Sequence, residues 1–445
     1  MPEITHKSTR RMLYTAAVLA LLAAIWASPA FADKNKPAPA AKPTEAPKLD
    51  ISNIVWPQPP AIARLRYLDY FSAQKPEAVV EKPQPKKSWM DRVAGITPED
   101  AAKKAGTKPR FQLGTPYGLA VDSKGLVYVA DTKVGAVFIF DPETHDTDFI
   151  KHGVHAKFGH IFGLAIDDAD RLFVSDGKEN HVLVFSPDHK LQAQFGEGVM
   201  DDPAGLAIDE ENRFLYVAST GSDQVLVYDA DTFKLLRKIG TAGKNHTLTT
   251  PGDFSKPTNV AVDKDGNLFV TDTLNNRVEV FDADGVFVRA FGKNGDGPGD
   301  FARPKGIAVD CDGHVWVADA MTNRLQVFTA EGDLRLVLGG FGSLPGQFKD
   351  LTAVTIDKKN RVFTSEQFEG RVQMFRYTTN TEAQAEFDRR AAKMQAATAA
   401  KKGEKKPAES APADKAQPPA TTPPETPKPA PPAAPPAAPA PVKAN

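Results

Sequence analysis

The stretch PTNVAVDKDGNLFVTDTLNNRVEVFD, residues 257–282, contains three short apolar runs separated by two turns. The first run, residues 260–262, leads into a turn in which Gly266 has no Cβ to oppose a positive φ. Residues 268–270 form the second run, and residues 277–281 alternate apolar and polar side chains with a period of two. The stretch therefore predicts three short strands.

The same pattern is written six times along the chain. The copies start at Pro116, Ile161, Pro203, Pro257, Pro304 and Leu351, at spacings of 45, 42, 54, 47 and 47 residues. A period of roughly 40–50 residues with strand-only content is typical of a β-propeller blade. One blade cannot bury both faces of its small sheet, but a ring of blades can, because each blade packs on two neighbours.

The copies resemble the NHL repeat family. The typical form of that repeat is P-x-G-[VIL]-A-[VI]-D, followed by G-x-[VIL]-[YF]-V-[AST]-D and then N-x-R-[VI]-x-[VL]-[FY]. The matches cover most of residues 111–376. The resemblance implies an all-β, six-bladed β-propeller. It implies no single activity, because NHL propellers include RNA-binding modules, protein-interaction scaffolds, signalling ectodomains and a zinc-dependent lyase.

A count of strands predicts how the ring closes. A fourth apolar run follows each of the first five copies, at residues 146–151, 190–195, 234–239, 286–291 and 333–338. The sixth copy has none, because the chain becomes polar after Tyr377. The strand-like segment RLRYLDYF, residues 64–71, has no repeat of its own. We expect residues 65–71 to supply the missing outer strand and so remove an exposed sheet edge.

Residues 1–32 have the features of a signal peptide. Lys7, Arg10 and Arg11 form a basic start, residues 12–27 are apolar, and Ala30-Phe31-Ala32 is a small-x-small cleavage site. We expect cleavage after Ala32, a periplasmic or secreted protein, and no membrane span once the signal is removed. An uncleaved anchor and, from Arg10-Arg11, a twin-arginine export route are the alternatives.

The rest of the chain divides by composition into a central domain and two flanks. Residues 33–60 predict a disordered linker, residues 61–376 the propeller, and residues 402–445 a Pro/Ala-rich disordered tail that could tether the protein to a surface. A long insertion, residues 72–114, precedes the first blade, and residues 377–401 predict a helix.

Two residues of these segments carry further expectations. Trp89 in the insertion is expected either to pack on the propeller or to contact a partner. Thr381, with Gln384 three residues later, has the form of a capping box and is expected to begin the helix.

Charge and cysteine content exclude some classes of protein. The 445 residues hold 55 Lys and Arg against 56 Asp and Glu, which disfavours a dedicated nucleic-acid binder. Cys311 is the one cysteine, so an internal disulfide, a CxxCH haem site and a cysteine zinc site are impossible. We expect no cofactor.

Aspartates recur at two positions of the repeat. Those that follow the first strand are Asp122, Asp167, Asp209, Asp263, Asp310 and Asp357, and those that close the second are Asp131, Asp176, Asp272 and Asp319. A carboxylate at a strand-to-turn junction accepts backbone N–H bonds and fixes the turn. Because they recur from blade to blade, we expect these carboxylates to be structural, whereas functional residues should break the repeat.

The positions on either side of the repeat's proline do vary, and they are expected at the mouth of the central channel. Before it stand Thr115, His160, Asp202, Lys256, Arg303 and Asp350, and after it Tyr117, Phe162, Ala204, Thr258, Lys305 and Thr352. The candidate binding residues are Tyr117, Phe162, His160, Lys256, Arg303 and Lys305. Aromatic and cationic side chains suit an acidic or aromatic group on a partner. The alternative is an ordinary solvated rim.

The only histidine cluster, His152, His155 and His160, is a weak candidate for a zinc site. The zinc lyase of the family takes its histidines from different blades, whereas these three lie on one loop. Resemblance to lactonase-type propellers would instead suggest calcium at Asn259, Asp202 and Asp350. We expect neither a metal nor a catalytic residue.

These observations predict an exported, non-catalytic binding scaffold that presents one propeller face to a protein partner in the periplasm or at the cell surface. The main alternative is a metal-dependent lyase or lactonase-type hydrolase with its site at the channel mouth. A second is binding of a nucleic acid or anionic polymer by the cationic residues, which export makes unfavourable for RNA.

Overall fold

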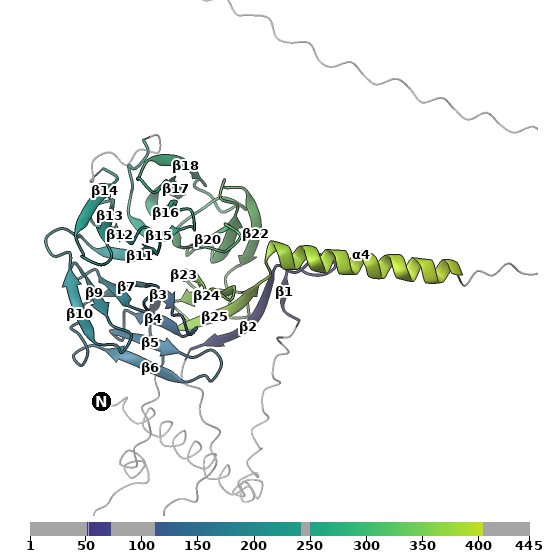
Figure 1. Cartoon of the computed structure of the whole chain (residues 1–445), viewed down its shortest axis with the longest axis horizontal. Helices are drawn as coiled ribbons and strands as arrows, with labels where there is room; N and C mark the ends of the chain where they lie inside the picture. Colours follow the sequence, from purple (N-terminus) through teal and green to yellow (C-terminus); the bar gives the residue numbers. More distant parts are fainter. Residues whose placement is uncertain (1–50, 52, 73–111, 242–249, 404–445) are drawn as a thin grey trace, which may run out of the picture. The chain divides into compact units, whose positions relative to one another are not determined.

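A computed structural model describes residues 51, 53–72, 112–241 and 250–403 of the chain. Strands of these residues form six antiparallel sheets arranged as the blades of a ring (Figure 1). The expected signal peptide and C-terminal tail, most of the linker, and most of the insertion with Trp89 lie outside the described residues.

Blades 1 to 3 each consist of four consecutive strands, from the innermost to the outermost. Blade 1 contains β3 (Pro116–Val121), β4 (Val127–Asp131), β5 (Ala136–Phe140) and β6 (Thr147–Lys151). Blade 2 contains β7 (Ile161–Ile166), β8 (Leu172–Asp176), β9 (His181–Phe185) and β10 (Leu191–Phe195). Blade 3 contains β11 (Pro203–Asp209), β12 (Phe214–Ser219), β13 (Gln224–Asp229) and β14 (Leu235–Ile239).

Blades 4 and 5 repeat this order, and blade 6 combines the two ends of the domain. Blade 4 contains β15 (Pro257–Val262), β16 (Leu268–Asp272), the 3₁₀ turn η2 (Thr273–Asn275), β17 (Arg277–Phe281) and β18 (Phe287–Phe291). Blade 5 contains β19 (Pro304–Val309), β20 (Val315–Asp319), β21 (Arg324–Phe328) and β22 (Leu334–Gly339). Blade 6 contains β23 (Leu351–Ile356), β24 (Arg361–Glu366), β25 (Arg371–Tyr377), β2 (Leu65–Phe71) and β1 (Val55–Trp56).

The predicted ring closure is confirmed. Strand β2 pairs antiparallel with β25, with Leu65 opposite Tyr377 and Phe71 opposite Val372. Leu65 is fully buried between blades 5 and 6, so the N-terminal strand contributes to the core as well as to the sheet edge.

The domain begins earlier than the sequence pattern indicated. Strand β1 pairs antiparallel with β2, so the end of the expected disordered linker over residues 33–60 is ordered as a fifth strand. The ring of Trp56 packs edge-on against Phe375, with 5.9 Å between centroids. Packing of this partly buried indole against the core explains the order, which the surrounding proline-rich composition concealed.

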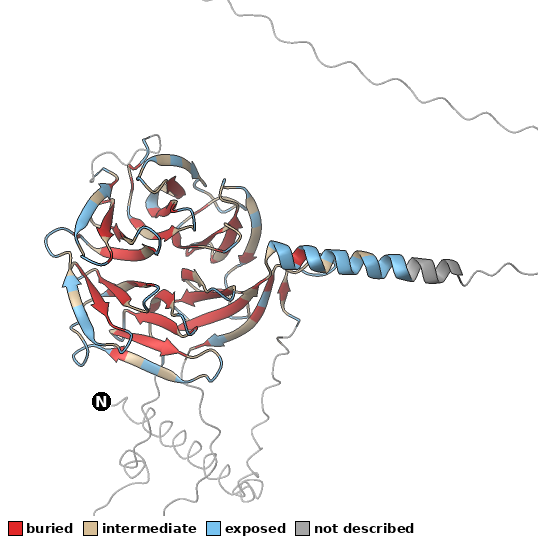
Figure 2. Ribbon diagram, in the orientation of Figure 1, coloured by how far each residue is buried: buried red, intermediate tan, exposed pale blue. Residues whose placement is uncertain are grey.

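Burial decreases from the middle of each blade to its outer edge (Figure 2). Every residue of β4, β8, β16 and β20 is buried, whereas the outer strands β10 and β18 alternate between exposed and half-buried residues. The interfaces between neighbouring blades hold the core clusters, each of which draws residues from two blades. Ring closure therefore buries the apolar faces that a single blade would expose.

An apolar residue three positions before each innermost strand fills the space under the connection between blades. These residues are Leu113, Phe158, Met200, Phe254, Phe301 and Phe348, and all are at most 5% exposed. The pattern recognised in the sequence starts at the first strand of each copy, so it did not include this position. It anchors each inter-blade connection to the core, which fixes the side chains that follow it.

The helix α4, Asn380–Gly403, follows the last blade, close to the expected range of 377–401. Its cap differs from the expected Thr381 and Gln384. The Thr379 hydroxyl accepts from the Glu382 N–H at 3.2 Å, and the Glu382 carboxylate accepts from the Thr379 N–H at 2.9 Å. This reciprocal pair is a capping box two residues earlier. None of the helices in the described residues is both long and apolar enough to cross a membrane.

We expect Leu65→Ala to lower the free energy of unfolding by about 2–5 kcal/mol, because it leaves a cavity in the closing blade. Denaturant unfolding of the mature protein measures this change. Arg66→Ala, one position along the same strand and exposed, is the matched control and should change stability little. Equal effects of the two substitutions would contradict the role of β2 in closing the ring.

Candidate functional site

The connections between blades and the turns between second and third strands lie on one side of the ring, which we call the mouth face. The Asp319 carboxylate joins the two kinds of segment, because it accepts from the N–H of Ala302 at 2.7 Å and of Met321 at 3.0 Å. Asp131 and Asp176 do the same in blades 1 and 2. These fully buried carboxylates have the structural role that their recurrence predicted.

The innermost strands meet closely at this face, and glycine permits the approach. A Cβ on Gly118 would lie 2.1 Å from the Phe162 carbonyl oxygen, and a Cβ on Gly163 would lie 2.1 Å from that of Ala204. Both distances are far inside van der Waals contact. The glycine of the P-x-G sequence therefore serves blade packing, and it brings the residue before it, such as Tyr117 or Phe162, to the channel mouth.

Hydroxyl groups tie five of the six inner strands to the blade before them. A Thr or Ser at the end of a second strand, or just after it, donates to a backbone carbonyl of the next blade's first strand. These bonds run from Thr132 to Ile161 (2.9 Å), Ser175 to Ala204 (2.6 Å), Thr220 to Pro257 (2.7 Å), Thr273 to Pro304 (2.7 Å) and Ser365 to Tyr117 (2.7 Å). The backbone that carries the mouth residues is thus fixed from both sides.

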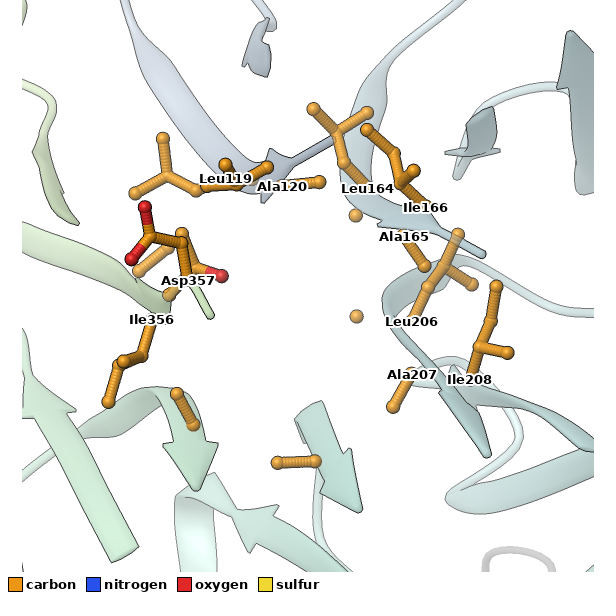
Figure 3. Close-up of a pocket in the computed structure, with 18 of the residues that line it drawn as sticks. Leu119, Ala120, Leu164, Ala165, Ile166, Leu206, Ala207, Ile208, Ile356 and Asp357 are labelled. Atoms are coloured by element: carbon orange, nitrogen blue, oxygen red, sulfur yellow. The ribbon is translucent and has the colours of Figure 1, made fainter. Parts of the chain in front are cut away.

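A cavity of about 360 Å³ lies inside the ring of inner strands, which all contribute to its lining (Figure 3). Tyr117 and Phe162 line its end at the mouth face. Apolar side chains such as Leu119, Leu164 and Leu206 line its body. Charged residues such as Asp122, Asp168 and Lys358 line its end at the opposite face. Each inner strand pairs with only one strand of its sheet, so its other edge presents backbone N–H and C=O groups toward the channel. The channel therefore has a mixed wall, an aromatic end at the mouth face and a charged end at the opposite face.

The structure brings the aromatic and cationic candidates together. The rings of Tyr117 and Phe162 pack edge to face at 5.2 Å between centroids, and His160 lies 6.5 Å from Phe162. The Lys305 ammonium stands 5.6 Å from the centre of the Tyr117 ring. Arg303 is exposed beside them. Five of the six candidate residues thus lie around the mouth on blades 1, 2 and 5, and the Lys305 ammonium reaches the Tyr117 ring.

Carboxylates complete the mouth, although the candidate set did not include them. Asp350 lies 3.6 Å from the Lys305 ammonium, and that lysine is only 8% exposed. Asp202 stands near Phe162, because a Cβ on Gly177 would meet both side chains within 3 Å. Lys256, the sixth candidate, donates from Nζ to the Thr220 carbonyl at 3.3 Å.

Burial shifts the ionisation of three mouth groups. It raises the pKa of Tyr117 to about 12, with the Asp350 charge adding to the rise and the Arg303 charge opposing it. Burial lowers the pKa of Lys305, which Asp350 partly restores. Burial also raises the pKa of Asp202, against the pull of Lys256. Titratable groups with shifted pKa values gather at binding and catalytic sites, although ion pairs in a structural role shift them too.

Three mouth residues have a left-handed backbone that is costly for residues with a side chain. Asp202, Lys256 and Asp350 have φ of 50°, 53° and 58°. Their N–H groups donate to side-chain oxygens of the preceding blade, on Asn180 at 2.8 Å, Asp223 at 2.8 Å and Asn323 at 2.6 Å. Strain of this kind persists where the surrounding structure holds it, often at functional sites.

The histidine candidates do not form one site. His152 accepts through Nδ1 from the Phe158 N–H at 2.9 Å, and His155 from the Lys151 N–H at 3.0 Å, whereas His160 lies at the mouth. Within residues 51, 53–72, 112–241 and 250–403, no group of three His, Cys, Asp or Glu side chains is placed to hold one metal ion. Of the calcium candidates, the Asn259 amide oxygen accepts from the Val260 N–H at 2.9 Å.

Two family models match the chain. Residues 113–140 match the NHL repeat, and residues 247–315 match a family described as 6-bladed beta-propeller. Both agree with the observed fold.

Among characterised proteins, the chain is similar to a probable peptidyl-alpha-hydroxyglycine alpha-amidating lyase of Caenorhabditis elegans, with 38% identity over 103 residues. That alignment covers 22% of this chain and 27% of the relative, so the chain matches about a quarter of the relative's length.

Several solved structures share the fold at low identity. A virginiamycin B lyase of Staphylococcus aureus is 15% identical, covers 61% of this chain and 83% of its own, and has a TM-score of 0.45. A gluconolactonase of Xanthomonas campestris is 17% identical, with coverage of 60% and 87% and a TM-score of 0.46. A protein of unknown function from Bacteroides thetaiotaomicron is 16% identical, with coverage of 59% and 70% and a TM-score of 0.49. At these values the comparisons assign no activity.

The geometry of the mouth makes a prediction about Tyr117. Absorbance titration of the wild-type protein minus Tyr117→Phe should show one tyrosine ionising near pH 12 rather than near 10. Tyr117 ionises at a lower pH in the unfolded chain than in the folded protein. Its contribution to the free energy of unfolding is therefore complete below about pH 10 and declines between about pH 10 and 12.

The neighbouring charges supply controls for that titration. Asp350→Asn should lower the pKa of Tyr117, and Arg303→Gln should raise it. A Tyr117 pKa near 10 that neither substitution moves would show that these three side chains do not share a site.

Proposed function

The chain is a six-bladed β-propeller that contains NHL repeats, and on this premise we propose that it is a non-catalytic binding scaffold. It holds a protein partner at the mouth face, in the periplasm or at the cell surface. The signal-like residues 1–32 support export, and the proline-rich residues 402–445 suit a tether.

The observation that carries the proposal is the group of mouth residues Tyr117, Phe162, Arg303 and Lys305. It combines a rigid aromatic pair, which lines one end of the channel cavity, with one exposed and one buried cation. Aromatic and arginine side chains are the commonest anchors of protein interfaces. Lys305 is buried and has Asp350 as its only close counter-charge among the described residues, at 3.6 Å, so the exposed Arg303 is the cation that an acidic group of a partner would meet first.

Electrostatic balance explains why the ligand should be acidic. The mouth contains Lys256, Arg303 and Lys305 against Asp202 and Asp350, and the pKa of Asp202 is raised by burial. A partner carboxylate that approaches Arg303 and Lys305 would raise the lowered pKa of Lys305, because it stabilises the charged ammonium. Binding should therefore weaken with salt, since Arg303 is exposed.

A second candidate function is a metal-dependent lyase or lactonase-type hydrolase at the same mouth. The observation that favours it is the local 38% identity to a protein named as a probable amidating lyase. Its weakness lies in the residues, because His152, His155 and His160 belong to one connection, and the first two accept from separate backbone N–H groups.

Metal content separates the two functions. We expect the mature protein, residues 33–445, purified without chelator, to contain well under one zinc or calcium ion per chain by elemental analysis. One metal ion per chain that is lost in His155→Ala and His160→Ala would favour the lyase or lactonase. His189→Ala, on the opposite face of blade 2, is the control histidine.

Loss of the cationic side should release the partner. We expect Arg303→Glu with Lys305→Met to reduce the amount of partner that co-purifies from the native host at least about tenfold, the effect of losing about 1.4 kcal/mol. Lys133→Glu reverses an exposed charge on the same face and should leave retention unchanged. Thermal unfolding of each variant checks folding. Equal retention of the partner by the wild type and by the Arg303→Glu, Lys305→Met variant would contradict the proposal.

A further inference from the structure

The tips of the turns between second and third strands differ between the two halves of the mouth face. At the position two residues after the end of the second strand, blades 4, 5 and 6 carry Leu274, Met321 and Phe368, which are 59%, 63% and 79% exposed. The equivalent residues of blades 1, 2 and 3 are Lys133, Lys178 and Gly221. Single exposed apolar residues are ordinary, but three at one repeat position in consecutive blades form a pattern.

Two further apolar side chains lie beside Phe368. Phe341 and Leu344, on the connection from blade 5 to blade 6, are 73% and 62% exposed. This connection is joined to the turn of Phe368, because the Ser343 hydroxyl donates to the Glu369 carboxylate at 2.8 Å and the Phe368 N–H donates to the Lys349 carbonyl at 3.4 Å. We call Leu274, Met321, Phe341, Leu344 and Phe368 the apolar arc.

The apolar arc lies outside the cationic part of the mouth. Lys256 belongs to the connection that enters blade 4, and Arg303 and Lys305 belong to the connection and first strand of blade 5. Blades 4 to 6 therefore combine apolar tips at the rim with cations nearer the axis. Blades 1 and 2 carry lysines at these tips and Tyr117 and Phe162 inside, although the smaller Val134 and Val154 are exposed on the same face.

We propose that the apolar arc and the adjoining cations form a docking surface for an acidic, apolar segment of a protein partner. The inference rests on the proposed function and names the partner's chemistry. Apolar side chains of the segment cover the arc, and its carboxylates meet Arg303 and Lys256. The apolar contact supplies affinity, and the charges set orientation and the rate of encounter.

A protein segment fits this surface better than an anionic membrane does. Turn tips that bind an anionic membrane need cations without neighbouring carboxylates. Lys349 beside the arc is instead paired with the carboxylate of Glu369, the residue that follows Phe368. Asp350 and Asp202 add negative charge at the mouth. These carboxylates would repel a surface of anionic lipid, whereas a protein segment can place its own charges between them.

Site-specific photocrosslinking of the full-length protein in its native host tests the proposal. p-Benzoylphenylalanine replaces Met321 or Phe368 in the apolar arc, Lys133 or Lys178 at the equivalent tips of blades 1 and 2, and His160 at the mouth. We expect the two arc positions and His160 to capture the same polypeptide, while the two lysine positions capture at least about tenfold less. Mass spectrometry of the captured peptide should find clustered Asp or Glu among apolar residues.

Two sets of substitutions connect the capture to the named contacts. Leu274→Ser with Phe368→Ser should reduce capture at position 321 about tenfold or more through lost apolar contact, and Arg303→Glu should do so through charge reversal. Lys133→Ser with Lys178→Ser is the matched control and should leave capture unchanged. Because all these side chains are exposed, the variants should fold, and thermal unfolding verifies this.

Other outcomes overturn the inference in distinguishable ways. Capture at His160 without capture in the arc would remove the arc and leave the binding function standing. Absence of capture at all positions would count against both. Crosslinks to a second copy of this chain, a captured peptide without acidic residues, or arc-dependent sedimentation with phosphatidylglycerol vesicles would each replace the proposed partner with a different one.

Discussion

The close approach of the six innermost strands is the constraint on which the rest of the structure depends. A side chain on Gly118 or Gly163 would overlap a carbonyl oxygen of the next blade, so these two boundaries need glycine, whereas Asn259 and Ala353 stand at the equivalent positions of blades 4 and 6. The same approach lets hydroxyl groups such as those of Ser175 and Ser365 bond across the boundary between blades. Closure buries the sheet faces, holds the inter-blade connections and gathers at one mouth residues that are far apart in the sequence.

Positions that recur in every blade and positions that vary have different roles. The recurring carboxylates, such as Asp176 and Asp319, are fully buried and use their oxygens on backbone N–H groups. They are saturated by the fold and have little capacity left for a ligand. Tyr117, Arg303 and Lys305 occupy equivalent positions that other blades fill differently, and their charges or rings face the mouth. Specificity is therefore available at the variable positions, because the recurring ones already support them.

Much of the fold could be predicted from sequence, because the repeat states its strands and turns six times. The closing strand β2 followed from the missing fourth strand of the last copy, and the mouth residues followed from their place beside the proline. Strand β1 was missed because Trp56 lies among prolines, and the helix cap was placed two residues late because Thr379 and Thr381 offer similar patterns. The apolar arc was missed because exposure at a turn tip depends on the whole ring.

Hydrogen–deuterium exchange of the full-length protein, isolated with and without its native partner, tests the central claim most directly. The account predicts that the partner slows exchange of backbone amides in residues 250–258, 300–306, 320–323, 341–350 and 367–370, which belong to the mouth face of blades 4 to 6. Amides in the turns on the opposite face, such as residues 122–126 and 167–171, should be unchanged. Protection confined to that opposite face or to the outer strands, with none at the mouth, would contradict the account.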